Sequence, residues 1–301
     1  GDFPSGPIRY LVCHYPGSQA DIEARHQQPV LYDALGVPVI ITYKPGSGGC
    51  TCWSLVAQSS PDGYLVASAT LPDILINPMV SKSAGYLMEH LEMLVIFQRI
   101  PIGLAVHKDS VFSNLRDFIE YARKNPRQLK VGADAKYSAQ YFAIIHLNRL
   151  AGIELTPVIF SGPAIQMIGF LSGKVDAVMG RLTDLLTHRS EVKILAIGSG
   201  DRVPWFPEVP TFAEEGFVMF PSLERGVVIP AGMPEYRKKI LEKAFLTAVK
   251  KKEYVRQMIQ NGFLPVCMGS EEAQGHVAGR IELYRVLLKD VENIKTKQEN
   301  K

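Results

Sequence analysis

Short apolar runs alternate with amphipathic stretches along nearly the whole chain. Residues 8–15 (IRYLVCHY) are typical of a buried strand, and residues 20–35 have helical spacing that stops at Gly36. Further strands are predicted over residues 37–43, 64–69, 93–98, 103–106, 129–132, 157–160, 175–179, 194–197, 226–229 and 263–267. Further helices are predicted over residues 50–58, 115–124, 138–150, 234–250 and 270–291, with Ser138 as a candidate cap. This alternation predicts an α/β fold with largely parallel sheets.

The chain of 301 residues is long for one domain, yet no single linker divides it. The middle block instead has the pattern of an insertion into the first. We therefore expect a discontinuous first lobe (1–103 and 226–301) and a second lobe (104–225). Two chain crossings, near residues 103 and 226, suit a hinge better than a single tether would.

Composition excludes several classes of protein. Hydrophobic residues make up 47% and charged residues 21%, which is ordinary for a soluble domain with a substantial core. A net charge of +3 without a basic tract argues against nucleic acid, and no apolar run is long enough to cross a bilayer. The start of the chain has no basic and apolar leader, so either there is no signal peptide or the chain begins after its cleavage point.

The four cysteines give no metal signature. Cys50 and Cys52 form a C-x-C pair without a nearby histidine or second pair, which is poor for zinc. Cys13 and Cys267 lie in apolar strand-like runs, and we expect both to be buried small apolar residues. A disulfide from Cys50 or Cys52 stays open, because spacing alone does not define a pair.

Two glycine-rich turns carry the clearest chemistry. Residues 16–21 (PGSQAD) and residues 45–49 (PGSGG) each lie between a predicted strand and a predicted helix. Such turns place free backbone N–H groups at a helix start, where the dipole favours an anion. A single turn of this kind is more often only a tight connection. Two at the carboxyl ends of parallel strands favour an anion site.

Nucleotide and nucleophile motifs are missing from the sequence. Neither turn matches Walker A or G-x-G-x-x-G, and no G-x-S-x-G elbow occurs. His14, His107 and His146 have no Ser or Asp partner in the sequence pattern, so we interpret them as structural. A Cys13–His14 dyad fails because neighbouring strand residues point to opposite faces.

Together these motifs resemble the extracytoplasmic receptors of tripartite tricarboxylate transporters, the TctC or Bug-type periplasmic binding proteins. The resemblance covers residues 7–284 in order. Its markers are Pro7-Ile8-Arg9, Pro16-Gly17 with Asp21 and Arg25, Pro45-Gly46-Ser47-Gly48-Gly49, Pro61-Asp62-Gly63-Tyr64, Ile76-Asn77-Pro78, Gly173-Lys174-Val175-Asp176, Pro207-Glu208-Val209-Pro210-Thr211, Glu214-Glu215-Gly216 and Pro230-Ala231-Gly232-Met233-Pro234. Each marker is weak alone, but the series is specific.

The resemblance implies a type II periplasmic-binding-protein fold, with two Rossmann-like lobes joined by a double-crossing hinge and closing around one ligand. It also implies a periplasmic, monomeric receptor for a small carboxylate, with membrane transporter subunits as partners and no cofactor, metal or catalytic residue. The family's first two loops hold a carboxylate through backbone amides and waters. Asp21 is expected to order the first loop. The expected ligand-binding residues are Pro16, Gly17, Ser18, Gln19, Ala20, Gly46, Ser47, Gly48, Gly49, Thr70, Tyr137, Ser138, Phe160, Gly180, Arg181 and Arg225.

Departures from the family pattern concern ligand selection. Ser18 and Gln19 replace glycine in the first loop, which would narrow the site or add side-chain donors, and Gly180-Arg181 replaces a common Asp-Ser. Arg181 or Arg225 would give a second carboxylate a charged partner, which favours a dicarboxylate. The other reading of each arginine is structural: a solvated strand end for the first, a hinge ion pair for the second.

Other classes of protein stay open at this point. A sensor with the same fold would have the same ligand site and pass its liganded state to a signalling partner. An enzyme using the C-x-C pair or His14 would turn over a bound carboxylate. A LysR-type effector domain shares the fold, but no helix-turn-helix precedes it here.

Overall fold

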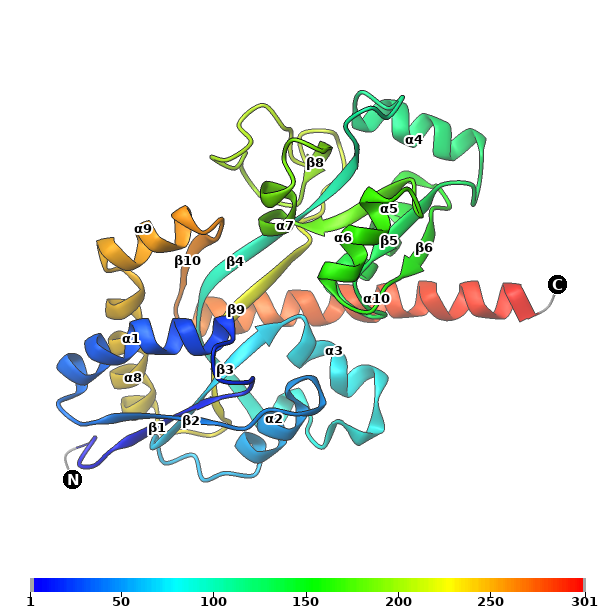
Figure 1. Ribbon diagram of the computed structural model, residues 1–301. Helices are drawn as coiled ribbons and strands as arrows, with labels where there is room; N and C mark the ends of the chain where they lie inside the picture. The colour runs from blue at the N-terminus through cyan, green and yellow to red at the C-terminus, as the bar shows by residue number, and fades with distance from the viewer. Residues whose placement is uncertain (1–2, 300–301) are drawn as a thin grey trace. The chain divides into compact units, whose positions relative to one another are not determined.

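The computed structural model describes residues 3–299, and the chain divides into two compact units (Figure 1). Unit 1 comprises Gly1–Arg99 and Glu224–Glu282, and unit 2 comprises Ile100–Leu223 and Leu283–Lys301. Both contain strands and helices in alternation, so the predicted α/β class is confirmed. Among the helices of residues 3–299, none is long and apolar enough to cross a membrane.

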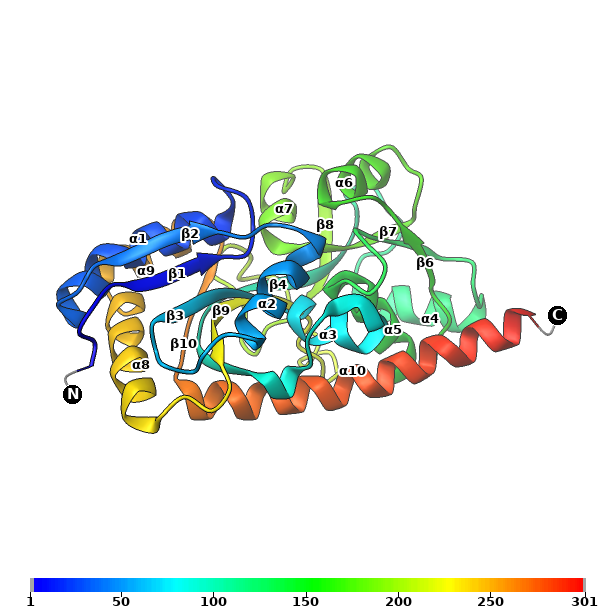
Figure 2. The same cartoon turned by 90° about the horizontal axis from the view of Figure 1, so that it is seen from below.

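The sheet of unit 1 has the order β2–β1–β3–β9–β4, and β10 also pairs with β4. Its strands are β1 (Ile8–Val12), β2 (Val39–Tyr43), β3 (Leu65–Leu71), β4 (Leu91–His107), β9 (Ser222–Pro230) and β10 (Leu264–Met268). β1 is parallel to both β2 and β3, and β1 and β2 run side by side in Figure 2. β9 is antiparallel to β3, so the expectation of largely parallel sheets holds only for part of the sheet.

Capping residues set both ends of helix α1 (Gln19–Leu35), and its predicted end at Gly36 is confirmed. The Ser18 hydroxyl accepts the N–H of Asp21, and Gly36 at φ 69° donates its N–H to the Tyr32 carbonyl. The helix packs against α8. The other helices of unit 1 are η1 (Ser47–Gly49), α2 (Cys50–Ala57), α3 (Asp73–Val80), η2 (Lys82–Ala84), η3 (Met88–His90), α8 (Glu235–Val249) and α9 (Lys252–Gln260).

The sheet of unit 2 contains the second half of β4, which pairs antiparallel with both β7 and β8. Beyond β7 lie β5 and β6, both parallel to their neighbours. The elements are α4 (Leu115–Lys124), β5 (Lys130–Ala133), α5 (Ala139–Ala151), β6 (Thr156–Ile159), α6 (Pro163–Leu171), β7 (Ala177–Arg181), α7 (Leu182–Thr187) and β8 (Val192–Ile197). Fully buried side chains such as Phe118, Phe170 and Leu185 fill the core. The predicted cap is confirmed, because the Ser138 hydroxyl accepts the Tyr141 N–H at 3.1 Å.

Strand β4 is one strand where the sequence predicts two. Up to Arg99 it pairs with β10, and from Ile102 it pairs with β7 and β8. Both halves find partners, so the extended backbone continues through Pro101, which has no N–H to donate. Four short helices, α3, α6, α7 and α9, were not predicted as separate elements, because pieces of six to nine residues carry little periodicity.

The chain passes between the two units in three elements. The passages in β4 and β9, at residues 99–100 and 223–224, lie in the regions where the sequence predicts crossings. The third, at residues 282–283, lies inside α10 (Ser270–Glu299) and was not predicted. The expected first lobe includes all of 226–301, whereas the residues from Leu283 onward group with unit 2.

A buried carboxylate joins these three elements within unit 1. Glu224 in β9 accepts from Arg99 of β4 at 2.7 Å and, from α10, His276 at 2.7 Å and Arg280 at 2.9 Å. Burial alone would raise the pKa of Glu224, but the His276 hydrogen bond and the two arginine charges lower it to about 2. The carboxylate is therefore ionised throughout the physiological range.

The cysteines differ from expectation. Cys13 is buried as predicted, but it forms a disulfide with Cys52, one of the two partners that the sequence left open. Cys267 is exposed, because β10 is only partly buried along its length, so its predicted burial is wrong. Cys50 is the other free cysteine.

We expect thiol titration of the unfolded, unreduced protein to detect two thiols, those of Cys50 and Cys267. Replacing both Cys13 and Cys52 by alanine should lower the free energy of unfolding by about 2–4 kcal/mol, as expected for a cross-link of this span. Urea unfolding measures the change. Detection of four thiols in the unreduced protein would contradict the pairing.

Candidate functional site

Two loops leave the same edge of the unit 1 sheet. β1 pairs in parallel with β2, where Val12 lies opposite Tyr43, and with β3, where Leu11 lies opposite Ala67. The carboxyl ends of these strands therefore meet, and ligands of α/β proteins commonly bind at such an edge. We call residues 16–20 the first loop and residues 46–49 the second loop.

The first loop uses some of its N–H groups internally. Gly17 donates to the Asp21 carboxylate at 2.7 Å, and Ser18 donates to the Tyr15 carbonyl at 3.1 Å. Gln19 and Ala20 are the first two residues of α1, so no carbonyl of the helix is placed to accept their N–H groups. The N–H groups of Gln19 and Ala20 are therefore the candidate donors of this loop for an anion.

Asp21 fixes the first loop to the end of β2. Its buried carboxylate accepts from Gly17 N–H, from the Tyr43 hydroxyl at 2.9 Å and from Arg25 Nε at 3.0 Å. Burial acts to raise the pKa of Asp21, but these hydrogen bonds and the Arg25 charge outweigh it and hold the pKa below its usual value. Asp21 is thus a structural anion that orders the loop.

The second loop depends on positive φ angles. Ser47, Gly48 and Gly49 have φ of 51°, 61° and 99°, and Gly49 donates to the Gly46 carbonyl at 3.1 Å. A Cβ on Gly49 would lie 2.4 Å from the Trp53 ring, whereas a Cβ on Gly48 would meet no atom within 4 Å. Gly49 is therefore required for packing, while Gly48 has open space beside its backbone.

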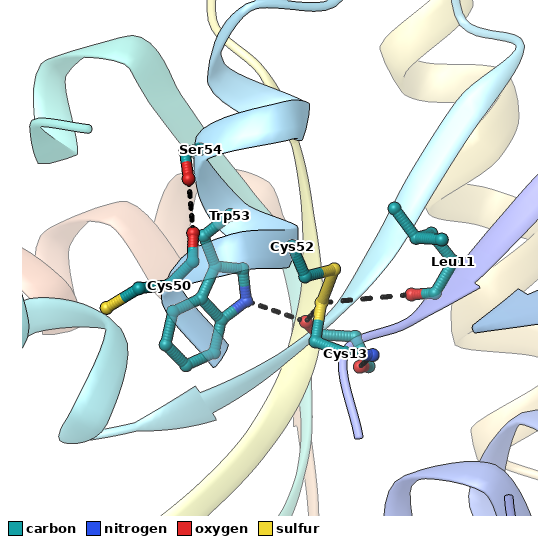
Figure 3. Close-up of a disulfide and its surroundings, with 7 residues drawn as sticks. Leu11, Cys13, Cys50, Cys52, Trp53 and Ser54 are labelled. Carbon is teal, nitrogen blue, oxygen red and sulfur yellow. Dashed lines mark hydrogen bonds between the residues drawn. A yellow bond between two sulfur atoms is a disulfide. The ribbon is translucent and has the colours of Figure 1, made fainter. Parts of the chain in front are cut away.

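A disulfide ties the two loops together (Figure 3). Cys13 follows β1 just before the first loop, and Cys52 lies in the first turn of α2 just after the second. Trp53 also anchors α2, because its indole N–H donates to the Ser68 carbonyl of β3 at 3.0 Å. The Cys50 sulfur points away from the disulfide in the same view.

Thr70 of β3 and Arg225 of β9 lie opposite each other near this edge of the sheet. Arg225 donates to the Gln98 side-chain carbonyl at 2.6 Å, and its guanidinium lies 5.8 Å from the centre of the Phe263 ring. The edge therefore combines backbone N–H groups with the Arg225 guanidinium.

His14 follows β1 at the same edge, although the sequence pattern marks it as structural. Burial and the Arg225 charge lower the pKa of His14, which favours the neutral imidazole. Its Nδ1 has no hydrogen-bond partner among the described residues.

In unit 2, Arg181 is already paired. Its Nη2 donates to Asp134 at 3.1 Å. Arg181 is the last residue of β7, and Asp134 directly follows the neighbouring parallel strand β5. Burial raises the pKa of Asp184, the Arg181 charge lowers it and the Asp134 charge raises it. Because Asp134 already pairs with this guanidinium, the expected role of Arg181 as a partner for a ligand carboxylate is weakened.

The remaining predicted residues of unit 2 have packing contacts. Tyr137, at φ 64°, stacks on Phe142 with ring centres 6.2 Å apart. The Phe160 ring covers Gly132 and Gly169, where added Cβ atoms would lie 3.0 and 2.2 Å from it. A Cβ on Gly180 would meet Leu185 at 3.0 Å. These contacts explain the residues without a ligand and leave their binding roles as predictions.

Three polar residues that contact predicted ligand-binding residues were not identified from the sequence. Glu23 lies four residues after Gln19 on α1, a spacing that could have indicated their contact. Gln98 is a buried polar residue in an apolar strand, which is a signal in itself. Asp134 lies two residues after the strand predicted over residues 129–132.

Comparison with known proteins identifies relatives along most of the chain. The family model for the tripartite tricarboxylate transporter family receptor, TctC, matches residues 23–292. The protein BugT of Bordetella pertussis is 27% identical over 295 residues, which cover 96% of this chain and 90% of BugT.

Solved structures share the fold. A TctC solute-binding protein from Polaromonas, solved without ligand, has a TM-score of 0.87 at 22% identity and covers 96% of this chain and 99% of its own. Two Rhodopseudomonas palustris proteins are also similar: Rpa4515 with adipate (TM-score 0.75, 24% identity, 96% and 98% covered) and MatC with bound malate (0.64, 22%, 97% and 98%). The predicted fold of periplasmic binding proteins is confirmed.

Replacing Asp21 with asparagine should loosen the first loop and lower the free energy of unfolding at pH 7 by about 1.5–3 kcal/mol, the value of hydrogen bonds to a charged group. Because the pKa of Asp21 is lowered in the folded protein, its contribution is fully present above the unfolded value of about 3.9. It is lost as the pH falls through the folded pKa. Urea unfolding across this range should show the two proteins converging at low pH, and a constant difference would contradict the assignment.

Proposed function

Because the chain belongs to the tripartite tricarboxylate transporter receptor family, we propose that it captures a small carboxylate outside the cytoplasm and delivers it to a tripartite membrane transporter. The observation that carries the proposal is the shared edge of β1, β2 and β3, where both loops begin.

The near carboxylate is held mainly by backbone in this proposal. Gln19 and Ala20 offer N–H groups at the start of a 17-residue helix, whose dipole favours an anion. The open space beside Gly48 lets a ligand approach the second loop closely. Backbone donors bind an anion without a charged side chain. Arg225 of β9 adds a positive charge at the same edge.

A dicarboxylate is the favoured ligand. Adipate and malate, bound by the two Rhodopseudomonas palustris proteins, are both dicarboxylates. Arg225 lies at the same edge as the loops, where a second carboxylate would gain a charge-assisted hydrogen bond. Arg181 is the weaker candidate because Asp134 already accepts from it.

The periplasm is the proposed compartment. A disulfide such as Cys13–Cys52 persists in an oxidising environment and is rare in the cytosol. The family description supports the same compartment, since a transporter receptor works outside the cytoplasmic membrane.

Calorimetry with adipate and hexanoate, a diacid and its monoacid counterpart, tests the function. Wild type should bind adipate more tightly, and Arg225→Ala should cost adipate roughly 1.5–3 kcal/mol but hexanoate much less. Arg181→Ala should have a smaller effect because its charge is already paired. Malate serves as a second diacid. Failure of wild type to bind either diacid would contradict the proposed dicarboxylate receptor.

Backbone anchoring predicts unequal effects at two neighbouring positions of the second loop. Ser47→Ala should change adipate affinity little, because the N–H is kept. Gly48→Val should weaken it about tenfold or more, since a β-branched side chain at φ 61° blocks approach and strains the backbone. Gly36→Val is the matched control: its φ is 69° in equally open space at the far end of α1, and its affinity should stay normal. Equal affinities for wild type and a folded Gly48→Val protein would refute this placement.

A further inference from the structure

A buried polar chain runs from the first loop to Arg225 through two residues that neither the sequence pattern nor the proposed function uses. Glu23 in α1 and Gln98 in β4 are both almost completely buried, at 3% and 0% exposed. Glu23 Oε1 accepts from Gln19 at 2.7 Å and from Gln98 at 2.6 Å. Gln98 in turn accepts from Arg225 at 2.6 Å.

We propose that Glu23 and Gln98 are positioning residues that hold Gln19 and Arg225 in place for the ligand. This inference rests on the proposed function, since Gln19 and Arg225 are the ligand-side groups of unit 1. It assigns a role to two residues that do not themselves touch the ligand.

The charges at both ends fix the orientation of the Gln98 amide. With its nitrogen toward Glu23 and its oxygen toward Arg225, the amide donates to a carboxylate and accepts from a guanidinium. The flipped amide would direct its oxygen at the carboxylate and its nitrogen at the guanidinium, and both contacts would be lost. Glu23 therefore orients the Gln98 amide so that its oxygen faces Arg225.

The two carboxylate oxygens of Glu23 have different hydrogen-bond partners. Oε1 serves Gln19 and Gln98, whereas Oε2 accepts from the Tyr254 hydroxyl. Burial, followed by the Glu23 charge, raises the pKa of Tyr254, so this hydroxyl stays protonated and donates. Tyr254 also accepts from the buried Gln27 at 3.2 Å. Its contact with Glu23 is therefore part of the core and not of the chain that leads to Arg225.

This division supplies a matched pair of variants. Gln98→Met removes the bridge to Arg225 with an uncharged side chain of similar length, so no charge changes. Tyr254→Phe removes a hydrogen bond from the same carboxylate on the core side. Both variants lose buried hydrogen bonds, but only Gln98→Met disconnects a ligand-side residue.

The experiment measures adipate affinity by calorimetry on the full chain, with thermal unfolding of each variant as the check on folding. Gln98→Met should weaken adipate binding about tenfold, whereas Tyr254→Phe should leave affinity unchanged while lowering the unfolding temperature. In the Arg225→Ala background, Gln98→Met should have almost no further effect, because a residue that acts through Arg225 cannot act without it.

Glu23 is tested through its other contact. Glu23→Gln should lose its effect on adipate affinity when Gln19 is already alanine. Gln98→Glu should not preserve adipate affinity, because its carboxylate would face the Glu23 carboxylate.

The outcomes separate the inference from the proposed function. Two outcomes would show a purely structural role and overturn the inference alone. In the first, Gln98→Met lowers adipate affinity equally in the wild-type and Arg225→Ala backgrounds. In the second, Gln98→Met and Tyr254→Phe lower adipate affinity equally. Wild type that binds neither adipate nor malate would overturn the proposed function, and the inference with it.

Discussion

The parallel pairing of β1 with β2 and β3 is the constraint on which the candidate site depends. It brings three strand ends to one edge, so both loops start from fixed points. The Cys13–Cys52 disulfide and the Asp21 carboxylate then hold the loops at that edge. Because a covalent bond and a buried carboxylate provide these supports, the loops are ordered without a ligand, which in the proposed receptor lowers the entropy cost of binding.

In the proposed receptor, side chains select among carboxylates. The two units differ in the contacts of their arginines. In unit 1, Arg225 donates to the side-chain carbonyl of Gln98. In unit 2, Asp134 forms an ion pair with Arg181. The Asp134 carboxylate offsets part of the Arg181 charge, which makes Arg181 a less favourable partner for an anion.

Local features of the sequence were the ones that could be predicted. Ser138 caps the helix that its position indicates, and the glycine turns follow strands as expected. The continuity of β4, the partner of Cys13 and the Gln98–Arg225 contact depend on residues far apart in the chain. No periodicity encodes such contacts, so only the folded chain shows them.

The most direct test of the central claim is an amide NMR titration of the isotope-labelled protein with adipate and malate. If the loop backbone holds the carboxylate, the N–H signals of Gln19, Ala20 and Gly48 should move most, in proportion to occupancy measured by calorimetry. A saturated complex whose loop amide signals stay unchanged would contradict the account.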